Sequence, residues 1–460
     1  MKQFAILLCC YLVSLSAFAQ ELDSVPQSEN SSSRFWQKTY QEYQMPEYFQ
    51  RKGYHYPLRQ EMNDRCADYL QEINKIAYQN AYTQDYVEGI FAQVAPVNLD
   101  PNRSENLNIR IFQSPAPDAF ILPNGTMLIS TGMLCTLDSE EELKAIIANE
   151  MAHYVLDHQI YNVARARLRA RRAAAWGTAL NIIGFVAGAV SVATSNDDGD
   201  DNNTASAIAD LISLGSTIGA VASVATADAT VNSLMKDHLG LKFKRKQEAI
   251  ADQIATQYLA DNGIQPNALP SALAKIRKFY KSEHQDRDLP RYESCRTLQK
   301  RINALAQNKE EFPVNHFYRK AVSDIVTFNA MMYLQDNLYK QAEALVQKNI
   351  DNRLASPHDY VILTKARMAQ NNTPESNEEC MQLLQKAREL SSAPNLDINK
   401  QEILLLLRMK KQAQAANALQ EYMEMLRQYV QQDGNNDEEN RWIEQEAKWA
   451  EKTIGKIELL

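Results

Sequence analysis

The sequence predicts a mainly α-helical protein with one small β-sheet, followed by an α-solenoid of tetratricopeptide-like helix pairs. Three observations support this fold class. Strand-like alternation of apolar residues occurs only between residues 107 and 130,. Helical spacing of apolar residues dominates elsewhere. Similar segments recur at intervals of 38 and 35 residues near the C-terminus, beginning at Leu345, Leu383 and Ala418,.

Length and composition limit the possible functions. The chain has 460 residues, of which 45% are hydrophobic and 23% charged, which is typical of a globular protein and excludes a disordered, collagenous or multi-span membrane protein,. Its net charge is -8, so nucleic acid is not expected as a partner, because phosphate binding depends on clustered Lys and Arg,. Two or three domains fit this length.

The N-terminus has the pattern of a secretory signal peptide. A short basic start at Lys2 precedes an apolar run from Phe4 to Phe18, and Ala17-Phe18-Ala19 forms a cleavage pattern before Gln20,. We therefore expect residues 1–19 to be removed and the protein to be exported. Residues 20–45 are polar and serine-rich at their centre, which predicts a flexible leader.

Four cysteines follow the predicted signal peptide, and they are widely separated. They are Cys66, Cys135, Cys295 and Cys380, without any Cys-x-x-Cys. This spacing indicates neither a disulfide scaffold nor a thiolate zinc site, although one disulfide remains possible.

The predicted strands flank a turn at Pro123-Asn124-Gly125. Leu107 to Phe112 alternates like a strand, and short β-rich runs precede and follow the turn,. A long helix is then expected after Ser139, because Ser139 and Glu142 have the spacing of a capping box,.

This helix carries part of a metal-binding motif. A zinc hydrolase helix reads His-Glu-x-x-His, since two imidazoles four residues apart face one metal ion and the Glu polarises a bound water. Here the sequence is Asn149-Glu150-x-x-His153, with Asn in place of the first His. Glu248 and Asp252, also four residues apart, suit a third ligand and an acceptor that orients a ligand,.

Together these motifs resemble the zinc metallopeptidases related to the CAAX prenyl proteases and HtpX-like proteases. The resemblance covers residues 46–310 and includes the run from Asp118 to Gly132. It implies a gluzincin-like domain that binds one zinc ion through Asn149, His153 and Glu248. The signal peptide and the repeats look most like the periplasmic metalloproteases of outer-membrane assembly.

The resemblance also implies a role for each remaining motif residue. Glu150 would be the general base on a zinc-bound water, and Asp252 would orient a ligand. The substrate would pair as an extended strand with one segment of the chain, namely Asp118, Ala119, Phe120, Ile121 and Leu122. The substrates would be unfolded or misassembled envelope proteins, in the periplasm or at the periplasmic face of the outer membrane.

The chain departs from the family pattern at two places. Leu289 precedes Pro290 where the family has His-Pro, with Arg296 or Arg301 as the following Arg. Asn149 is a weaker zinc ligand than His, but its oxygen could bind the metal while its amide group donates to Asp252.

Several alternatives to this zinc site stay open. His153 and Asp157 could form a different metal pair, away from Glu150, and the site residues could equally form a metal-free polar network. In that case the protein would be a pseudo-peptidase that serves as a chaperone or binding module. His158 fits a structural role.

Residues 173–236 are expected to form a helical hairpin. Ala173 to Thr194 has no charge over 22 residues, but its glycines and the charges around it disfavour a membrane span,. We expect the hairpin to lie over the cleft, with possible peripheral membrane contact by the Arg-rich segment before it.

The C-terminal residues 315–460 are predicted to stack as tetratricopeptide-like pairs that present a surface to a protein partner. An irregular helical bundle is the alternative interpretation.

Overall fold

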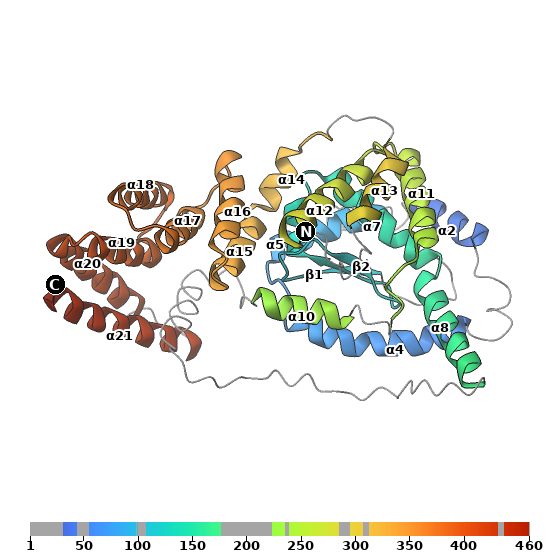
Figure 1. The fold of residues 1–460 in the computed structure, drawn as a ribbon, viewed down its shortest axis with the longest axis horizontal. Coiled ribbons are helices and arrows are strands. Elements are labelled where there is room, and N and C mark those ends of the chain that lie inside the picture. Colours follow the sequence, from blue (N-terminus) through green and yellow to red (C-terminus); the bar gives the residue numbers. More distant parts are fainter. Residues whose placement is uncertain are drawn as a thin grey trace, which may run out of the picture.

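The computed structural model describes residues 31–43, 55–97, 99, 107–175, 223–234, 239–284, 295–306, 312–430 and 437–459, whose arrangement is shown in Figure 1. The predicted signal peptide, the centre of the predicted hairpin (176–222) and Leu289-Pro290 lie outside these residues. In the first two-thirds of the chain the helices are α2 (Ser31–Glu42), α4 (His55–Asn74), α5 (Ala81–Val94), α6 (Thr131–Thr136), α7 (Glu140–Val155), α8 (His158–Ala175), α10 (Val224–Leu234), α11 (Arg245–Asp261), α12 (Ala268–His284) and α13 (Cys295–Leu305). None of the helices in the described ranges is long and apolar enough to cross a membrane.

The expected strands form one three-stranded sheet in the order β1-β3-β2. Strand β1 (Asn108–Phe112) runs parallel to β3 (Thr126–Ser130), and β2 (Ala119–Ile121) runs antiparallel to β3. Gly125 has a positive φ of 87° in the turn between β2 and β3, a conformation that glycine adopts without strain,. The sheet is thus a mixed one, with β2 at one edge.

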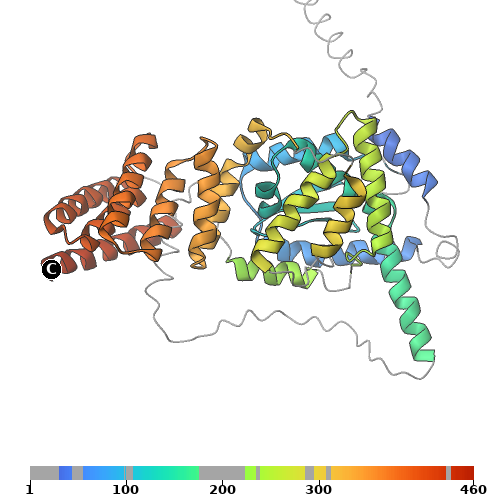
Figure 2. The ribbon, with the colours of Figure 1, turned by 45° about the horizontal axis from the view of Figure 1, so that its top comes forward.

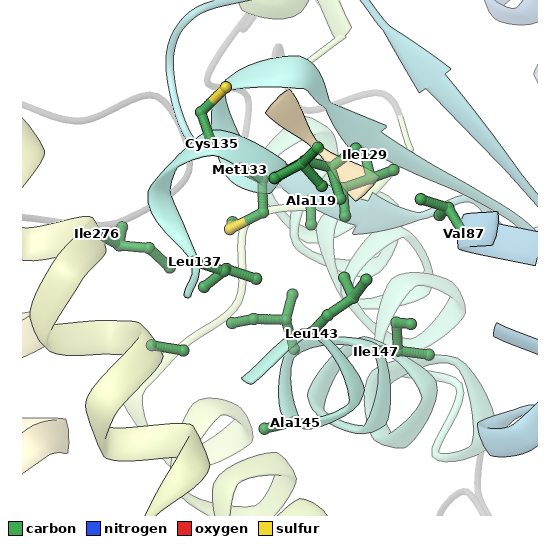
Figure 3. Close-up of a cluster of buried hydrophobic side chains, with 14 of the residues drawn as sticks. Val87, Ala119, Ile129, Met133, Cys135, Leu137, Leu143, Ala145, Ile147 and Ile276 are labelled. Carbon is green, nitrogen blue, oxygen red and sulfur yellow. The ribbon is translucent and has the colours of Figure 1, made fainter. Parts of the chain in front are cut away.

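Helix α7 is the centre of the hydrophobic core. It contacts α5 and β2 as well as α11 and α12. Figure 3 shows Leu143 and Ile147 of α7 among apolar side chains of the sheet and of α12, including Ile129 and Ile276. The side chain of Ser139 accepts a hydrogen bond from the backbone N–H of Glu142, so half of the expected capping box is present,.

The expectation of a flexible leader over residues 20–45 is wrong for residues 31–42, which form α2. The Trp36 ring is fully buried, stacks on Tyr258 of α11 with 5.1 Å between ring centroids, and donates from Nε1 to the Val94 carbonyl. Burial of a tryptophan with a satisfied N–H outweighs the polar composition of this segment. The leader therefore includes a helix that is part of the core.

All four cysteines are free and buried in the described part of the chain. The disulfide that the sequence left possible is not formed.

The C-terminal part consists of successive packed helices: α14 (His316–Ala321), α15 (Ser323–Gln335), α16 (Tyr339–Asp351), α17 (Pro357–Gln370), α18 (Pro374–Leu390), α19 (Leu396–Arg408), α20 (Gln412–Val430) and α21 (Asp437–Leu459). Neighbours along the chain pack on one another, as Figures 1 and 2 show. Asn337, Arg353 and Lys410 adopt positive φ in the short connections,. Assignment to the tetratricopeptide class stays a prediction.

The predicted boundary near residue 315 does not separate two cores. Tyr318 of α14 is fully buried and donates to the carbonyl of Leu134 in α6, and Lys348 of α16 donates to that of Cys135 at 2.6 Å. One apolar cluster runs from the sheet into α15 and α16. The first C-terminal helices are therefore packed into the domain that contains the sheet.

An ion cluster at the start of α7 reinforces this junction. Asp138 lies 2.7 Å from the Nζ atom of Lys275 (α12), 2.9 Å from Arg319 (α14) and 3.4 Å from Lys348 (α16). Lys275 also contacts the buried Glu142 at 2.7 Å. Burial alone would raise the pKa of Asp138, but the three cations outweigh burial and lower this pKa to about 2,.

We predict that Asp138→Asn lowers the urea midpoint of unfolding at pH 7, corresponding to about 1–2 kcal/mol after allowance for solvent screening. Because the folded pKa is below the unfolded one, this stabilisation is present above the unfolded pKa and is lost as pH falls through the folded pKa,. The difference in unfolding free energy between the unaltered protein and Asp138→Asn should therefore shrink as the pH falls from about 5 to about 2. Asp64→Asn, at an exposed position of α4, is the control. A difference independent of pH would contradict the ion-cluster explanation.

Candidate functional site

The residues of the Asn-Glu-x-x-His motif and of the Glu248-x-x-x-Asp252 motif meet between two helices. Helix α7 carries Asn149, Glu150 and His153, and α11 carries Glu248 and Asp252; all five are buried. His153 Nε2 lies 3.6 Å from Glu248 Oε2, and the Asn149 amide donates to Asp252 Oδ1 at 3.0 Å. The second contact is the hydrogen bond expected from the sequence.

The imidazole of His153 is fixed from two sides. Its Nδ1 lies 2.9 Å from Nδ1 of His158, and its face stacks on Phe243, with 3.7 Å between ring centroids and 18° between planes. Burial, together with the neighbouring His153, lowers the pKa of His158 to about 3, so His158 is neutral,. We assign His153 Nδ1–H as the donor to His158, which leaves the lone pair of His153 on Nε2, facing Glu248.

A sharp turn between α7 and α8 makes the pairing of the two histidines possible. Asp157 has a φ of 54° and ends the first helix, so α8 starts at His158 in a new direction. The side chain of Asp157 forms a buried ion pair with Arg59 of α4. Metal binding by the alternative pair of His153 and Asp157 would therefore compete with the ion pair to Arg59.

Arg301 of α13 connects the two carboxylates of α11. Its Nη1 atom lies 2.8 Å from Glu248 Oε2, and its Nε and Nη2 atoms donate to both oxygens of Asp252 at 2.9 and 2.6 Å. Of the two arginines that the sequence left open, Arg301 is the one at the site. Burial raises the pKa of Asp252, and Arg301 counteracts this rise by binding the ionised form,.

The predicted substrate strand lies at the edge of the sheet but is not open along its length. All five residues from Asp118 to Leu122 have at most 2% of their surface exposed. The backbones of Asp118 and Leu122 bond to β3, so the carbonyl of Ile121 points to the opposite, free edge,. There it accepts a hydrogen bond from Gln159 at 3.1 Å. Pairing of a substrate strand at this carbonyl would require Gln159 to turn away.

The residues present fit a metal ion incompletely. No group of three His, Cys, Asp or Glu side chains with metal-binding geometry occurs within the described ranges. His153 Nε2 is nevertheless fully buried without a hydrogen bond, and it faces a carboxylate oxygen at a distance that two ligands of one ion can have,. With the Nδ2 atom of Asn149 committed to Asp252, its oxygen is the atom left as a third, weak ligand,.

Comparison with known proteins indicates the family of the domain that contains these residues. A model of peptidase family M48 matches residues 81–309, about half of the chain. This part of the chain belongs to peptidase family M48, a family of zinc metallopeptidases. The match includes α7, α11 and α13, so all the site residues described above except Arg59 lie within the M48 domain.

Curated relatives include proteins named as metalloendopeptidases. The chain is 25% identical over 121 residues to mitochondrial metalloendopeptidase OMA1 of Schizosaccharomyces pombe, covering 24% of this chain and 36% of the relative. It is 35% and 32% identical over 74 residues to metalloendopeptidase OMA1 of Bos taurus and of Homo sapiens, covering 16% of this chain and 14% of each relative. The chain thus aligns with about a third or less of the length of these relatives.

The sequence did not indicate Phe243, Gln159 or Arg59 as parts of the site. Phe243 approaches His153 because Gly240, with a φ of 68°, passes so close to the carbonyl of Gln159 that a Cβ would lie 2.4 Å from it. A positive φ and such a close approach both favour glycine, so the single Gly240 is the only feature of the sequence that could have indicated this contact,. These contacts join residues 38 or more positions apart, which local patterns do not encode.

We predict that Phe243→Ala weakens zinc binding about 10-fold or more, since loss of a contact that orients a metal ligand typically costs 10–100-fold in affinity. Phe243→Tyr keeps the stacked ring and should bind zinc nearly as the unaltered protein does. Affinity is measured by competition with a chromophoric chelator, and circular dichroism checks the fold. Equal affinities of the Ala and Tyr variants would show that stacking does not position His153.

Proposed function

We propose that this protein is a zinc metalloendopeptidase with weakened metal affinity, in which His153, Glu248 and the amide oxygen of Asn149 hold the ion. One observation carries the proposal: the buried Nε2 atom of His153 makes no hydrogen bond and faces Glu248 at 3.6 Å. A purely structural histidine that is fully buried would be expected to satisfy both ring nitrogens. The M48 match and the named relatives support the same reaction class.

The protein side chains have separate tasks in peptide-bond hydrolysis. When bound, the zinc ion polarises the scissile carbonyl and acidifies water. Glu150, buried on the same helix as His153, takes the proton of the attacking water and delivers it to the leaving amine,. His158 and Phe243 hold the His153 ring, while Arg301 and Asp252 hold Glu248 and Asn149.

The biological setting is proposed from the sequence patterns. The signal-peptide pattern at residues 1–19 supports export, and the helix pairs after residue 315 offer a surface for a protein partner. We propose unfolded or misassembled envelope proteins as substrates, in the periplasm or at the periplasmic face of an outer membrane. Peripheral membrane contact by α8 is supported by its arginines and by its extension away from the domain in Figure 2,.

A second candidate function is that of a metal-poor pseudo-peptidase acting as a chaperone or binding module. The contact of 2.8 Å between Arg301 and Glu248 favours it, because the guanidinium neutralises the carboxylate that zinc would need,. The amide oxygen of Asn149 is also a weaker zinc ligand than the imidazole that the family has at this position. Under this proposal the same residues form a polar network that locks α7, α11 and α13 together.

We predict that the purified protein lacking residues 1–19 binds zinc and cleaves casein. Glu150→Gln should retain zinc but lower the cleavage rate about 10²–10⁴-fold, since it removes the base. Asn149→His restores an imidazole ligand and should tighten zinc binding at least about 100-fold. Zinc is measured by chelator competition and by metal analysis.

The two candidates give different outcomes. If the unaltered protein takes up no zinc and cleavage appears only in Asn149→His, the enzyme proposal is overturned in favour of the pseudo-peptidase. If cleavage by the unaltered protein persists in Glu150→Gln, Glu150 is not the base and the assigned site is wrong.

A further inference from the structure

Gln159 occupies a position at the free edge of β2 that the backbone of another chain could also use. It is the second residue of α8 and has 1% of its surface exposed. Its side-chain Nε2 atom donates to the backbone carbonyl of Ile121 at 3.1 Å. A side-chain amide that donates to an edge carbonyl takes the place of the N–H group of a neighbouring strand. The side chain of Gln159 thus satisfies a group of the sheet that would otherwise be open to pairing.

Both faces of β2 are covered by apolar packing, which leaves the edge for contact with another chain. Ala119 and Ile121 belong to the main apolar cluster, whereas Phe120 and Leu122 pack in a second cluster on the other face. Backbone groups of alternate residues point to the same edge, so those of Ala119 and Ile121 point away from β3,. An extended chain could therefore bond to both residues, whereas Gln159 bonds to one of them.

This edge is adjacent to the candidate site. Helix α7, which carries Glu150 and His153, packs on β2. Gln159 directly follows His158, whose Nδ1 atom lies 2.9 Å from Nδ1 of His153. Two consecutive residues of α8 therefore contact the imidazole of the site and the edge of the sheet. A chain that pairs with β2 at Ile121 would run beside the site residues.

Contacts on several sides hold the backbone of Gln159 in place. Gly240 passes so close that a Cβ there would lie 2.4 Å from the Gln159 carbonyl oxygen. Asn162, in the same turn of α8, donates from its side chain to the carbonyl of Gly240 at 3.2 Å. The ion pair of Arg59 with Asp157 holds the start of α8 against α4. Rotation of the Gln159 side chain breaks none of these contacts, so the edge can open without movement of α8.

We propose that Gln159 is a gate at the edge of β2, because its amide competes with the backbone of an extended chain for the carbonyl of Ile121. A chain that bonds at Ile121 alone exchanges one hydrogen bond for another and gains little. A chain that lies along β2 and bonds to Ala119 as well gains bonds that Gln159 does not supply. The gate therefore favours extended, unfolded segments over short or folded ones. As a statement about substrates this rests on the proposed function, whereas the competition itself needs neither zinc nor cleavage.

The test measures how tightly an extended peptide binds once the Gln159 amide is removed. Gln159→Met keeps a side chain of similar length that cannot donate a hydrogen bond. The parent protein lacks residues 1–19, carries Glu150→Gln and is kept in EDTA. The probe is fluorescein-labelled Lys-Thr-Val-Thr-Val-Thr-Lys, and its binding is followed by fluorescence anisotropy. We expect Gln159→Met to bind the probe about 3- to 10-fold more tightly than the parent, the effect of one competing hydrogen bond.

A matched variant and a modified peptide locate the effect. Gln113 is also buried and donates to a backbone carbonyl, that of Ala77 at 2.9 Å, but it follows β1 at the other edge of the sheet. Gln113→Met should therefore bind the probe as the parent does. A probe that is N-methylated at all its Thr and Val residues cannot donate to Ile121, so it should bind the parent and Gln159→Met equally weakly.

Gln159→Ala removes the whole side chain and is the second gate variant, with circular dichroism as the check of folding. It should also bind the probe more tightly than the parent. Binding by the folded gate variants that is no tighter than that of the parent overturns the proposal. An equal gain in Gln113→Met overturns it as well, because loosening of the sheet in general would then explain the result. A merely structural glutamine would give weaker or unchanged binding when it is replaced.

The results also separate this proposal from the proposed function. Casein cleavage that depends on Glu150, without any gain in probe binding by Gln159→Met, would leave the enzyme standing and remove the gate. A gain in probe binding by a protein that takes up no zinc would support the gate and remove the enzyme.

Discussion

The burial of helix α7 is the constraint on which the rest of the structure depends. Every residue from Glu142 to Val155 except Lys144 is buried, so each polar group of this helix must find a partner inside the protein,. Glu142 forms an ion pair with Lys275, the amide of Asn149 donates to Asp252, and the ring of His153 hydrogen-bonds to that of His158. These partners come from α8, α11 and α12, and they fix how those helices surround α7. The site therefore forms where this buried helix pairs its polar groups, with the Nε2 atom of His153 left without a hydrogen bond.

Arg301 gives the site two possible uses. Its bonds to Glu248 and Asp252 stabilise buried carboxylates that would otherwise be costly, and they also hold Glu248 beside His153,. The same positive charge competes with a metal ion for Glu248. Two imidazole ligands would bind the metal more strongly than one imidazole together with the amide oxygen of Asn149. The balance between a zinc enzyme and a polar binding module thus depends on one guanidinium and one amide.

The C-terminal helices are joined to the M48 domain by charge and by apolar packing. Asp138 directly precedes the capped start of α7, and its cations come from α12, α14 and α16. Tyr318 adds a fully buried ring whose hydroxyl bonds to α6. The first C-terminal helices therefore share one apolar core with α7.

The sequence by itself determined the features that depend on local patterns. The strands around Pro123-Asn124-Gly125, the capped helix with Glu150 and His153, and the Glu248-x-x-x-Asp252 helix all follow from spacing along one segment, and the structure has each of them. Only the tertiary structure decided what faces these residues. It placed Phe243 on His153, chose Arg301 over Arg296, and turned the expected flexible leader into α2, anchored by Trp36. The reason is physical: periodicity encodes which face of an element is apolar, whereas the partner of a buried polar or aromatic group is set by packing between distant segments.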